Sequence, residues 1–258
     1  MLRERLWTGL LGGGVLLALV YVGGKLYALL LFLLAAVAFD EWLRLRHARR
    51  SDGAYPFFMI LYLLFLIGAG VQWTRHPLFL SLFVLILLAG TVVSRNRIDV
   101  ADIAHALLGT LYLGLGFFYM GLLRQSPDGL LTTYYIFLLT WANDSTAYFV
   151  GKSFGRHKLW PSISPNKTWE GALSGVAAAL LVSVIFDWFL PGRLGFLLLS
   201  GLVLALAGQM GDLVESAVKR SFRVKDSSHV LPGHGGILDR FDSLLLAFPV
   251  AYLIFYLV

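Results

Sequence analysis

The stretch LYALLLFLLAAVAF, residues 26–39, contains no charged side chain and no alternation of polar with apolar residues. A transmembrane β-strand would show such alternation over about 10 residues, whereas a membrane-spanning helix needs about 20 predominantly apolar residues. Similar apolar runs recur along the whole chain. We therefore predict an all-α polytopic membrane protein.

The composition agrees with this class of protein. Of 258 residues, 58% are hydrophobic and 14% are charged, against about 25% charged residues in a typical soluble domain. The absence of Cys excludes disulfides, thiolate metal sites and a Cys nucleophile. No linker interrupts the chain, so we expect a single integral membrane domain over residues 1–258, with residues 1–130 as scaffold and residues 131–258 carrying the functional site.

The apolar runs predict nine spans. They cover residues 6–22, 26–43, 56–72, 77–93, 103–123, 132–150, 170–190, 194–216 and 241–258. A cytoplasmic N-terminus places 17 of the 21 Lys and Arg residues on the cytoplasmic side. Because cytoplasmic loops are enriched in Lys and Arg, we predict this orientation, with the C-terminus on the opposite side. The formal net charge of +6 is attributed to topology, and no nucleic-acid partner is expected.

The first group of polar residues lies around the sixth predicted span. Asn143 and Asp144 fall inside an apolar run, where a carboxylate costs about 2.5–3.5 kcal/mol on insertion scales. Asp144 is therefore expected to face a cavity, a cation or a partner. The stretch SPNKTWEG, residues 164–171, predicts a helix start with Thr168 as cap and Glu170 in the first turn. Lys167 beside that helix N-terminus would add charge to an anion site that suits a phosphate.

The second group lies at the eighth and ninth spans. Four polar residues at i, i+3, i+4 and i+7 share one helical face: Asp212, Glu215, Ser216 and Lys219. A helix end that reaches water, with Glu215 and Lys219 as an ion pair, is the alternative interpretation. Asp239 and Asp242 follow at i, i+3 spacing at the start of the last span.

Carboxylates that face one another would repel unless a cation lay between them. Oxygen ligands suit Mg²⁺, which binds through one or two carboxylates and substrate phosphates. Zinc is not expected, since the six His are scattered and have no Cys partners. In GHGG, residues 233–236, three glycines flank His234 and would let backbone N–H groups approach a ligand. A cytoplasm-facing site with carboxylates for metal and cations for phosphates fits phosphoryl or nucleotidyl transfer.

One longer motif is more specific. The stretch SAVKRSFRVKDSSHVLPGHGGILDRFD, residues 216–242, resembles the signature of the phosphatidate cytidylyltransferases, the CDP-diacylglycerol synthases, at every fixed position over 27 residues. ISPNKTWEG, residues 163–171, and ANDSTAYFVG, residues 142–151, also resemble that family. The resemblance implies an enzyme that joins CTP and phosphatidic acid to give CDP-diacylglycerol and pyrophosphate in phospholipid biosynthesis.

The family likeness further implies Mg²⁺ dependence, with one or two divalent ions and room for a monovalent ion. The expected partners are CTP, phosphatidic acid and membrane lipids, with a homodimer left open. The expected location is a bacterial cytoplasmic (inner) membrane with the active site facing the cytoplasm.

The resemblance also implies roles for individual residues. Asp212 and Asp239 are the first choice as metal ligands, with Asp144 and Asp242 as neighbouring or second-ion ligands. The cations expected to clamp the triphosphate and the lipid phosphate are Lys167, Lys219, Arg220, Lys225 and Arg240. The nucleotide or pyrophosphate pocket would be shaped by His234, Gly235 and Gly236. The remaining substrate-binding and supporting residues are Asn143, Ser164, Thr168, Glu170, Glu215 and Ser216, and Asp226 is expected to pair with a loop cation.

Three other functions are alternatives. A transporter of a phosphorylated metabolite would predict repeated halves, whereas the charged motifs crowd the last four predicted spans. The charged and His residues of the first five spans lie near span ends and are interpreted as interfacial: Asp40, Glu41, Asp102 and His105. A CTP-dependent lipid kinase would release CDP rather than pyrophosphate. A non-catalytic lipid-binding scaffold would not require 27 patterned residues.

Overall fold

The computed structural model describes residues 2–46, 54–71, 77–228 and 235–256. Within these residues the chain forms nine helices: α1 (Leu2–Val22), α2 (Gly24–Arg46), α3 (Ala54–Gly70), α4 (Pro77–Val93), α5 (Val100–Arg124), α6 (Gly129–Phe154), α7 (Trp169–Phe186), α8 (Leu194–Ser221) and α9 (Leu238–Tyr256). A hairpin of two short strands, β1 (Lys158–Trp160) and β2 (Ser164–Thr168), joins α6 to α7. Each predicted span overlaps one of these helices, although the seventh, 170–190, extends beyond the end of α7, and the expected all-α class is confirmed.

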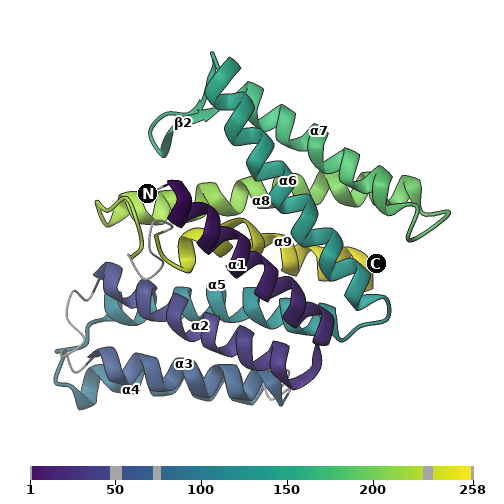
Figure 1. Ribbon diagram of the computed structural model, residues 1–258. Coiled ribbons are helices and arrows are strands. Elements are labelled where there is room, and N and C mark those ends of the chain that lie inside the picture. Colours follow the sequence, from purple (N-terminus) through teal and green to yellow (C-terminus); the bar gives the residue numbers. More distant parts are fainter. Residues whose placement is uncertain (1, 47–53, 72–76, 229–234, 257–258) are drawn as a thin grey trace.

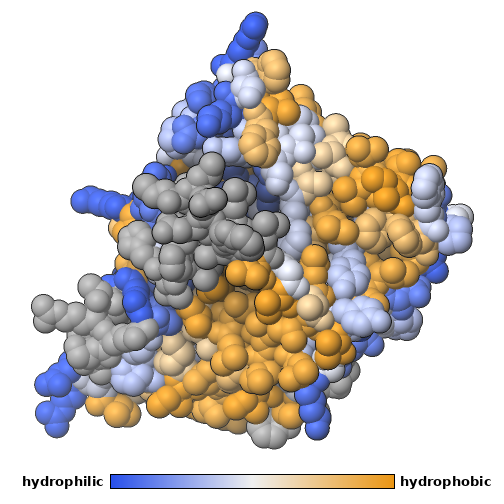
Figure 2. Space-filling model, in the orientation of Figure 1, coloured by the Kyte–Doolittle hydropathy of each residue, from blue (hydrophilic) through white to orange (hydrophobic). Residues whose placement is uncertain are grey.

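The helices have the apolar character of a membrane protein. Four of them are long and apolar enough to cross a bilayer, namely α2, α5, α7 and α8, and shorter apolar helices cover Leu11–Val22, Ala54–Gly70 and Pro77–Val93. Large apolar side chains such as Leu78, Leu85 and Val92 on α4 are exposed. Figure 2 shows that such side chains form a broad apolar surface between hydrophilic ends. Soluble monomers rarely expose contiguous apolar patches beyond a few hundred Å², so this surface is suited to lipid.

The helices pack in two neighbouring groups. In Figure 1, α2, α3, α4 and α5 lie roughly side by side, while α6 and α7 form a separate pair. The pair α8 and α9 connects the groups, since α9 packs on α5 and α8 packs on α7. Small residues permit the closest contacts: a Cβ on Gly116 of α5 would lie 2.5 Å from Leu245 of α9. The buried core contains large aromatic residues, including Trp42, Tyr62 and Phe248.

Charged side chains from elements that are distant in the sequence meet at one end of the bundle. There Arg46 at the end of α2 pairs with Asp102 at the start of α5, with 2.6 Å between Nε and Oδ1. Lys219 near the end of α8 pairs with Asp239 at the start of α9. The loops at the other end also contact one another, since Arg193 lies 3.7 Å from Asp128. The molecule therefore has two distinct polar ends.

The hairpin lies immediately before the predicted helix start. Residues 164–168 form β2, which pairs antiparallel with β1 in the register Lys158↔Thr168 and Trp160↔Ser164. Pro161 and Pro165 keep this segment out of the helix, because proline lacks a backbone N–H and disfavours helical backbone in the preceding residue. The helix begins only after these prolines, at Trp169.

Candidate active site

The predicted group on α6 is buried and is held in place by side chains of α8. Asn143 is fully buried, and its Nδ2 donates to Asp144 Oδ1 at 3.0 Å. Gln209 Nε2 of α8 donates to Asn143 Oδ1 at 2.9 Å and to the carbonyl oxygen of Ala172 on α7 at 2.9 Å. A Cβ on Gly175 of α7 would lie 2.6 Å from Asn143 Oδ1, so glycine is needed for this close packing. A chain of amides thus orients the Asp144 carboxylate.

Three carboxylates from three helices converge beside this group. Asp242 of α9 interacts electrostatically with Asp212 of α8 and Asp144 of α6, and Asp144 also interacts with Asp212. Lys167 of β2 supplies the nearby positive charge, with its Nζ 2.6 Å from Asp212 Oδ2. Ser216 Oγ donates to Asp212 Oδ1 at 3.4 Å. We call Asp144, Asp212 and Asp242 the acidic triad. A single lysine does not neutralise its three carboxylates.

The donor set of the acidic triad fits a hard divalent cation, because it offers only carboxylate oxygens on partly buried side chains. Among the residues that the structure describes, no group of three Asp, Glu or His side chains already has the spacing of a metal site. Mg²⁺ typically uses one or two carboxylates and completes its shell with water and substrate phosphates. The triad is therefore compatible with Mg²⁺ that arrives together with a phosphorylated substrate.

A second charged cluster lies next to the triad. Lys219 Nζ lies 2.6 Å from Glu215 Oε2 and 2.6 Å from Asp239 Oδ1, and all three side chains are largely buried. Asp239 Oδ2 also accepts hydrogen bonds from Gly236 N at 2.8 Å and from Ser227 N at 3.1 Å. The alternative interpretation of Glu215 and Lys219 as an ion pair is confirmed, although the pair is buried and not at a helix end in water.

These contacts place Asp239 with Lys219, whereas Asp242 lies with Asp212 and Asp144. The two clusters adjoin, since Glu215 interacts with Asp242 as well as with Asp239. Coordination of a metal by Asp239 would require it to exchange one of its present donors.

A cavity of about 560 Å³ opens beside Asp144 and Asp212 of the triad, bounded by α6, the hairpin, α7 and α8. Its polar lining includes Asp144, Lys152, Lys158, Asn166, Lys167, Gln209 and Asp212. Three lysines and two carboxylates therefore line one cavity, and Lys167 is already paired with Asp212. Such an arrangement suits a polyphosphate, with lysines for the phosphate oxygens and carboxylates for an accompanying metal.

The start of α7 fastens the hairpin beside this cavity. Thr168 caps α7 and accepts a hydrogen bond from Gly171 N at 3.2 Å, which confirms the predicted cap. Glu170 lies in the first turn, as predicted, and its Oε1 is 2.6 Å from Nδ1 of His157. Arg220 donates to the carbonyl oxygens of Ile163 at 3.3 Å and Val224 at 3.1 Å, so it ties the hairpin to the end of α8.

The other predicted residues lie at the same end of the molecule. Ser164 pairs with Trp160 in the hairpin. Three charged residues are exposed near the second cluster: Lys225, Asp226 and Arg240. Gly235 has a φ of +80°, which favours glycine, and a Cβ there would lie 2.8 Å from Asp239 Oδ2. His234 lies outside the described residues.

Comparison with known proteins identifies the family. The sequence profile of the cytidylyltransferase family matches residues 3–258. This chain belongs to the cytidylyltransferase family. Its predicted family membership is thereby confirmed.

Within the cytidylyltransferase family, the chain is 40% identical to the phosphatidate cytidylyltransferase of Bacillus subtilis (strain 168) over 259 residues, which covers 97% of this chain and 96% of that protein. It is 38% identical to the phosphatidate cytidylyltransferase of Staphylococcus haemolyticus (strain JCSC1435), covering 96% of this chain and 97% of that protein. The enzyme of the same name from Staphylococcus aureus (strain COL) is 37% identical, with the same coverage. The similarity therefore extends over the N-terminal half as well as the motifs.

Sequence reasoning missed several polar residues of this cytidylyltransferase. Lys152 and Lys158 were attributed to membrane topology, yet both line the cavity. Asp40, Glu41, Asp102 and His105 lie near helix ends, as expected, but all four are buried between helices, with exposed fractions of 7%, 0%, 8% and 8%. Glu41 lies in an apolar span, and the rule that ionisable residues there have partners would have identified it, as it did Asp144.

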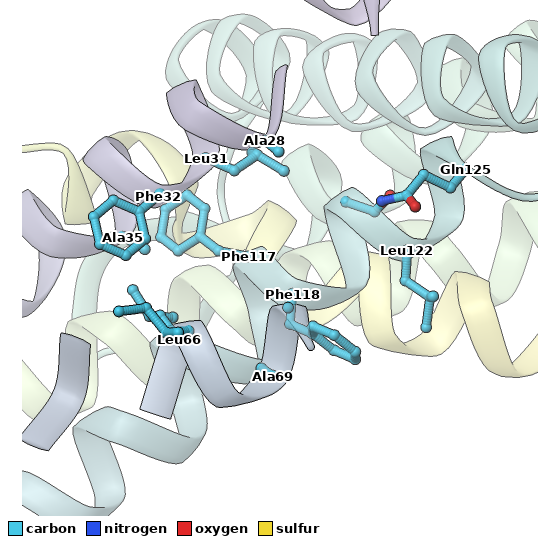
Figure 3. A pocket seen from close by; sticks show the side chains of 13 residues that line it. Ala28, Leu31, Phe32, Ala35, Leu66, Ala69, Phe117, Phe118, Leu122 and Gln125 are labelled. Carbon is cyan, nitrogen blue, oxygen red and sulfur yellow. The ribbon is translucent and has the colours of Figure 1, made fainter. Parts of the chain in front are cut away.

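A second cavity, of about 330 Å³, lies between α2, α3 and α5 (Figure 3). Its lining side chains are apolar, including Leu31, Phe32 and Phe117, with Gln125 as the polar exception among them. This cavity contains no group for phosphate chemistry, which separates it from the site above the triad.

Proposed function

We propose that this member of the cytidylyltransferase family is a phosphatidate cytidylyltransferase, which joins CTP and phosphatidic acid to give CDP-diacylglycerol and pyrophosphate. The observation that carries the proposal is the cavity that is lined by Lys152, Lys158 and Lys167 together with Asp144 and Asp212. Full-length similarity to proteins named phosphatidate cytidylyltransferase supports the choice of both substrates.

The chemistry requires positioning more than proton transfer. A phosphate oxygen of the lipid forms a bond to the α-phosphorus of CTP, and the bond from that phosphorus to the bridging oxygen of the β-phosphate breaks. The lipid phosphate is already an anion at neutral pH, so no strong general base is needed. The barrier arises from bringing anions together, which fixed cations lower. The cavity lysines would hold the triphosphate, and the apolar helix surfaces would keep the acyl chains in lipid.

Mg²⁺ is proposed as the cofactor, with one or two divalent ions. Asp212 and Asp239 remain the first choice as ligands, with Asp144 and Asp242 beside them, and the acidic triad favours Asp144, Asp212 and Asp242 as one group. When bound, Mg²⁺ would neutralise phosphate charge at the reacting centre.

The proposed topology has nine spans, with a cytoplasmic N-terminus in a bacterial cytoplasmic membrane. It is supported by the excess of Lys and Arg on the predicted cytoplasmic side. The end of the bundle with the triad, the second cluster and the hairpin would face the cytoplasm, where CTP is available. The bacterial relatives agree with this setting.

The test uses purified protein, Mg²⁺, phosphatidic acid and CTP labelled on either the α- or the γ-phosphate. We expect α-label in the organic phase and γ-label in water-soluble pyrophosphate. γ-Label in the lipid would instead indicate a CTP-dependent lipid kinase. If both labels stayed in water, the proposed activity would be wrong, and flux of a phosphorylated metabolite into liposomes without CTP would favour a transporter.

A further inference from the structure

Glu41 is a buried carboxylate of the N-terminal half. It contacts residues of the motif at 216–242, which lie between 186 and 197 positions later in the chain. Its Oε1 accepts hydrogen bonds from Ser228 Oγ at 2.6 Å and Ile237 N at 2.9 Å. Its Oε2 accepts from Leu238 N at 2.8 Å, with Ser227 Oγ at 3.1 Å. Both oxygens thus face backbone N–H groups that can only donate, which is the environment of an ionised carboxylate.

The amides that Glu41 binds are those at the start of α9, which begins at Leu238. The first N–H groups of a helix have no partner within the helix and carry partial positive charge. Glu41 therefore serves as the acceptor for this helix end from another helix. Its own charge is offset by the helix terminus and by hydroxyl donors.

Glu41 also connects to the second charged cluster. The Ser227 hydroxyl lies 3.1 Å from Glu41 Oε2 and 2.9 Å from Asp239 Oδ2, so it bridges the two carboxylates. Asp239 in turn binds Lys219 Nζ at 2.6 Å. A continuous path of contacts runs from α2 through the loop residue Ser227 to Asp239 and Lys219.

Gly236 provides independent support for this contact. A Cβ at Gly236 would lie 2.5 Å from Glu41 Oε2 and 2.1 Å from Ser227 Oγ. Only glycine leaves space for the Glu41 carboxylate at this point, so the second glycine of the GG pair is explained by Glu41. This reason differs from the predicted role of Gly236 in a nucleotide pocket.

We infer that Glu41 is a positioning residue of the cytidylyltransferase site: it fixes the start of α9 and the adjoining loop so that Asp239 and Lys219 keep their mutual geometry. The inference rests on the proposed function for its effect on activity. Its structural part, the order of the α9 start, does not depend on the reaction.

The test is Glu41→Gln, which preserves size but turns an NH₂ group toward one of the two backbone donors. We expect kcat for CDP-diacylglycerol formation to fall about 10–100-fold, as for other residues that orient functional side chains, with little change in the KM for CTP. Hydrogen exchange of amides 235–242 should rise, while melting temperature and exchange in α4 stay near those of the parent protein.

Asp40→Asn is the matched control on the same helix. Asp40 is also buried, and its described contacts are with Arg44 Nη2 at 2.5 Å and with Tyr55. We expect Asp40→Asn to retain activity and to leave exchange of amides 235–242 unchanged. Parental kcat in Glu41→Gln, or loss of activity without increased exchange at the α9 start, would overturn the inference.

Ser227→Ala provides a second route in case Glu41→Gln does not fold. It removes the hydroxyl bridge and should raise exchange of the same amides, with a smaller loss of kcat. In the double variant the two losses should be non-additive, because both act through one network. Independent effects, or unchanged exchange in Ser227→Ala, would count against the inference. If the parent protein itself lacked activity, the proposed function would fail, while the exchange measurements would still test Glu41.

Discussion

Asp242 shows at the residue scale why the site needs a cation. It interacts electrostatically with Asp212 and Asp144, with Lys167 as the neighbouring positive charge. Like charges in a poorly hydrated site destabilise the folded protein when no counter-ion is bound. Functional sites commonly retain such a local cost because the charges are needed for binding. The i, i+3 spacing of Asp239 and Asp242 was visible in the sequence, but it could not show which of them faces the triad.

Replacement of Asp242 by Asn should therefore separate stability from function. Without divalent cations, Asp242→Asn should melt higher than the parent protein, by about 2–4 °C for each kcal/mol of repulsion removed. Mg²⁺ with CTP should stabilise the parent protein more than the variant, since a ligand stabilises only the state that binds it. Cytidylyl transfer should fall by at least about 100-fold, the scale expected when a group at the reacting centre is misplaced.

Asp187→Asn is the control for this experiment, because Asp187 ends α7 away from the triad and accepts from Arg193 N at 3.2 Å. Its activity and its response to Mg²⁺ should match those of the parent protein. An Asp242→Asn protein that melts lower in chelator and keeps its activity would exclude Asp242 from the metal and phosphate site.

At the scale of elements, apolar run length predicted where helices form, but not what the polar connections do. The predicted spans coincide with the helices because burial in lipid requires long apolar segments with satisfied backbone groups. The hairpin was missed since its strands are three and five residues long and carry no apolar run. Gly171 and Gly175 of α7 allow its close packing on α6.

Gly175 tests how closely α6 and α7 must pack. A Cβ added at Gly175 would lie 2.6 Å from Asn143 Oδ1 and 2.8 Å from the Asn143 backbone carbonyl oxygen. Gly175→Ala should destabilise the protein by about 1–3 kcal/mol, the usual range for overpacking, and should reduce activity by displacing the amides that orient Asp144. Gly195→Ala is the control, since its Cβ would meet nothing within 4 Å. Equal melting temperatures for both variants would show that α6 and α7 can move apart without a loss of stability.

At the scale of the whole molecule, the N-terminal half proves to be in contact with the site. The division into a scaffold over residues 1–130 and a site over residues 131–258 stays a prediction, but Glu41 crosses it through its bonds to Ile237 and Leu238. Contacts of this range cannot be predicted from one sequence, because helix order in space is not encoded by any local spacing. The orientation of the two ends in the membrane, in contrast, is predicted by the distribution of Lys and Arg.

The topology of the two ends is directly testable because the chain contains no Cys. Gln125 is exposed between α5 and α6, at the end where Tyr256 donates to the carbonyl oxygen of Pro127 and Arg193 lies near Asp128. Ser153 is exposed near the end of α6, beside the hairpin. With a cytoplasmic N-terminus, a membrane-impermeant maleimide should label Gln125→Cys in intact bacterial cells. It should label Ser153→Cys only after permeabilisation, and the parent protein should give no signal in either case. Labelling of Ser153→Cys in intact cells would place the cavity lysines on the outer side of the membrane, away from CTP. This result would contradict both the proposed topology and the proposed reaction. It would also place the loops rich in Lys and Arg outside the cytoplasm, against the usual distribution of these residues.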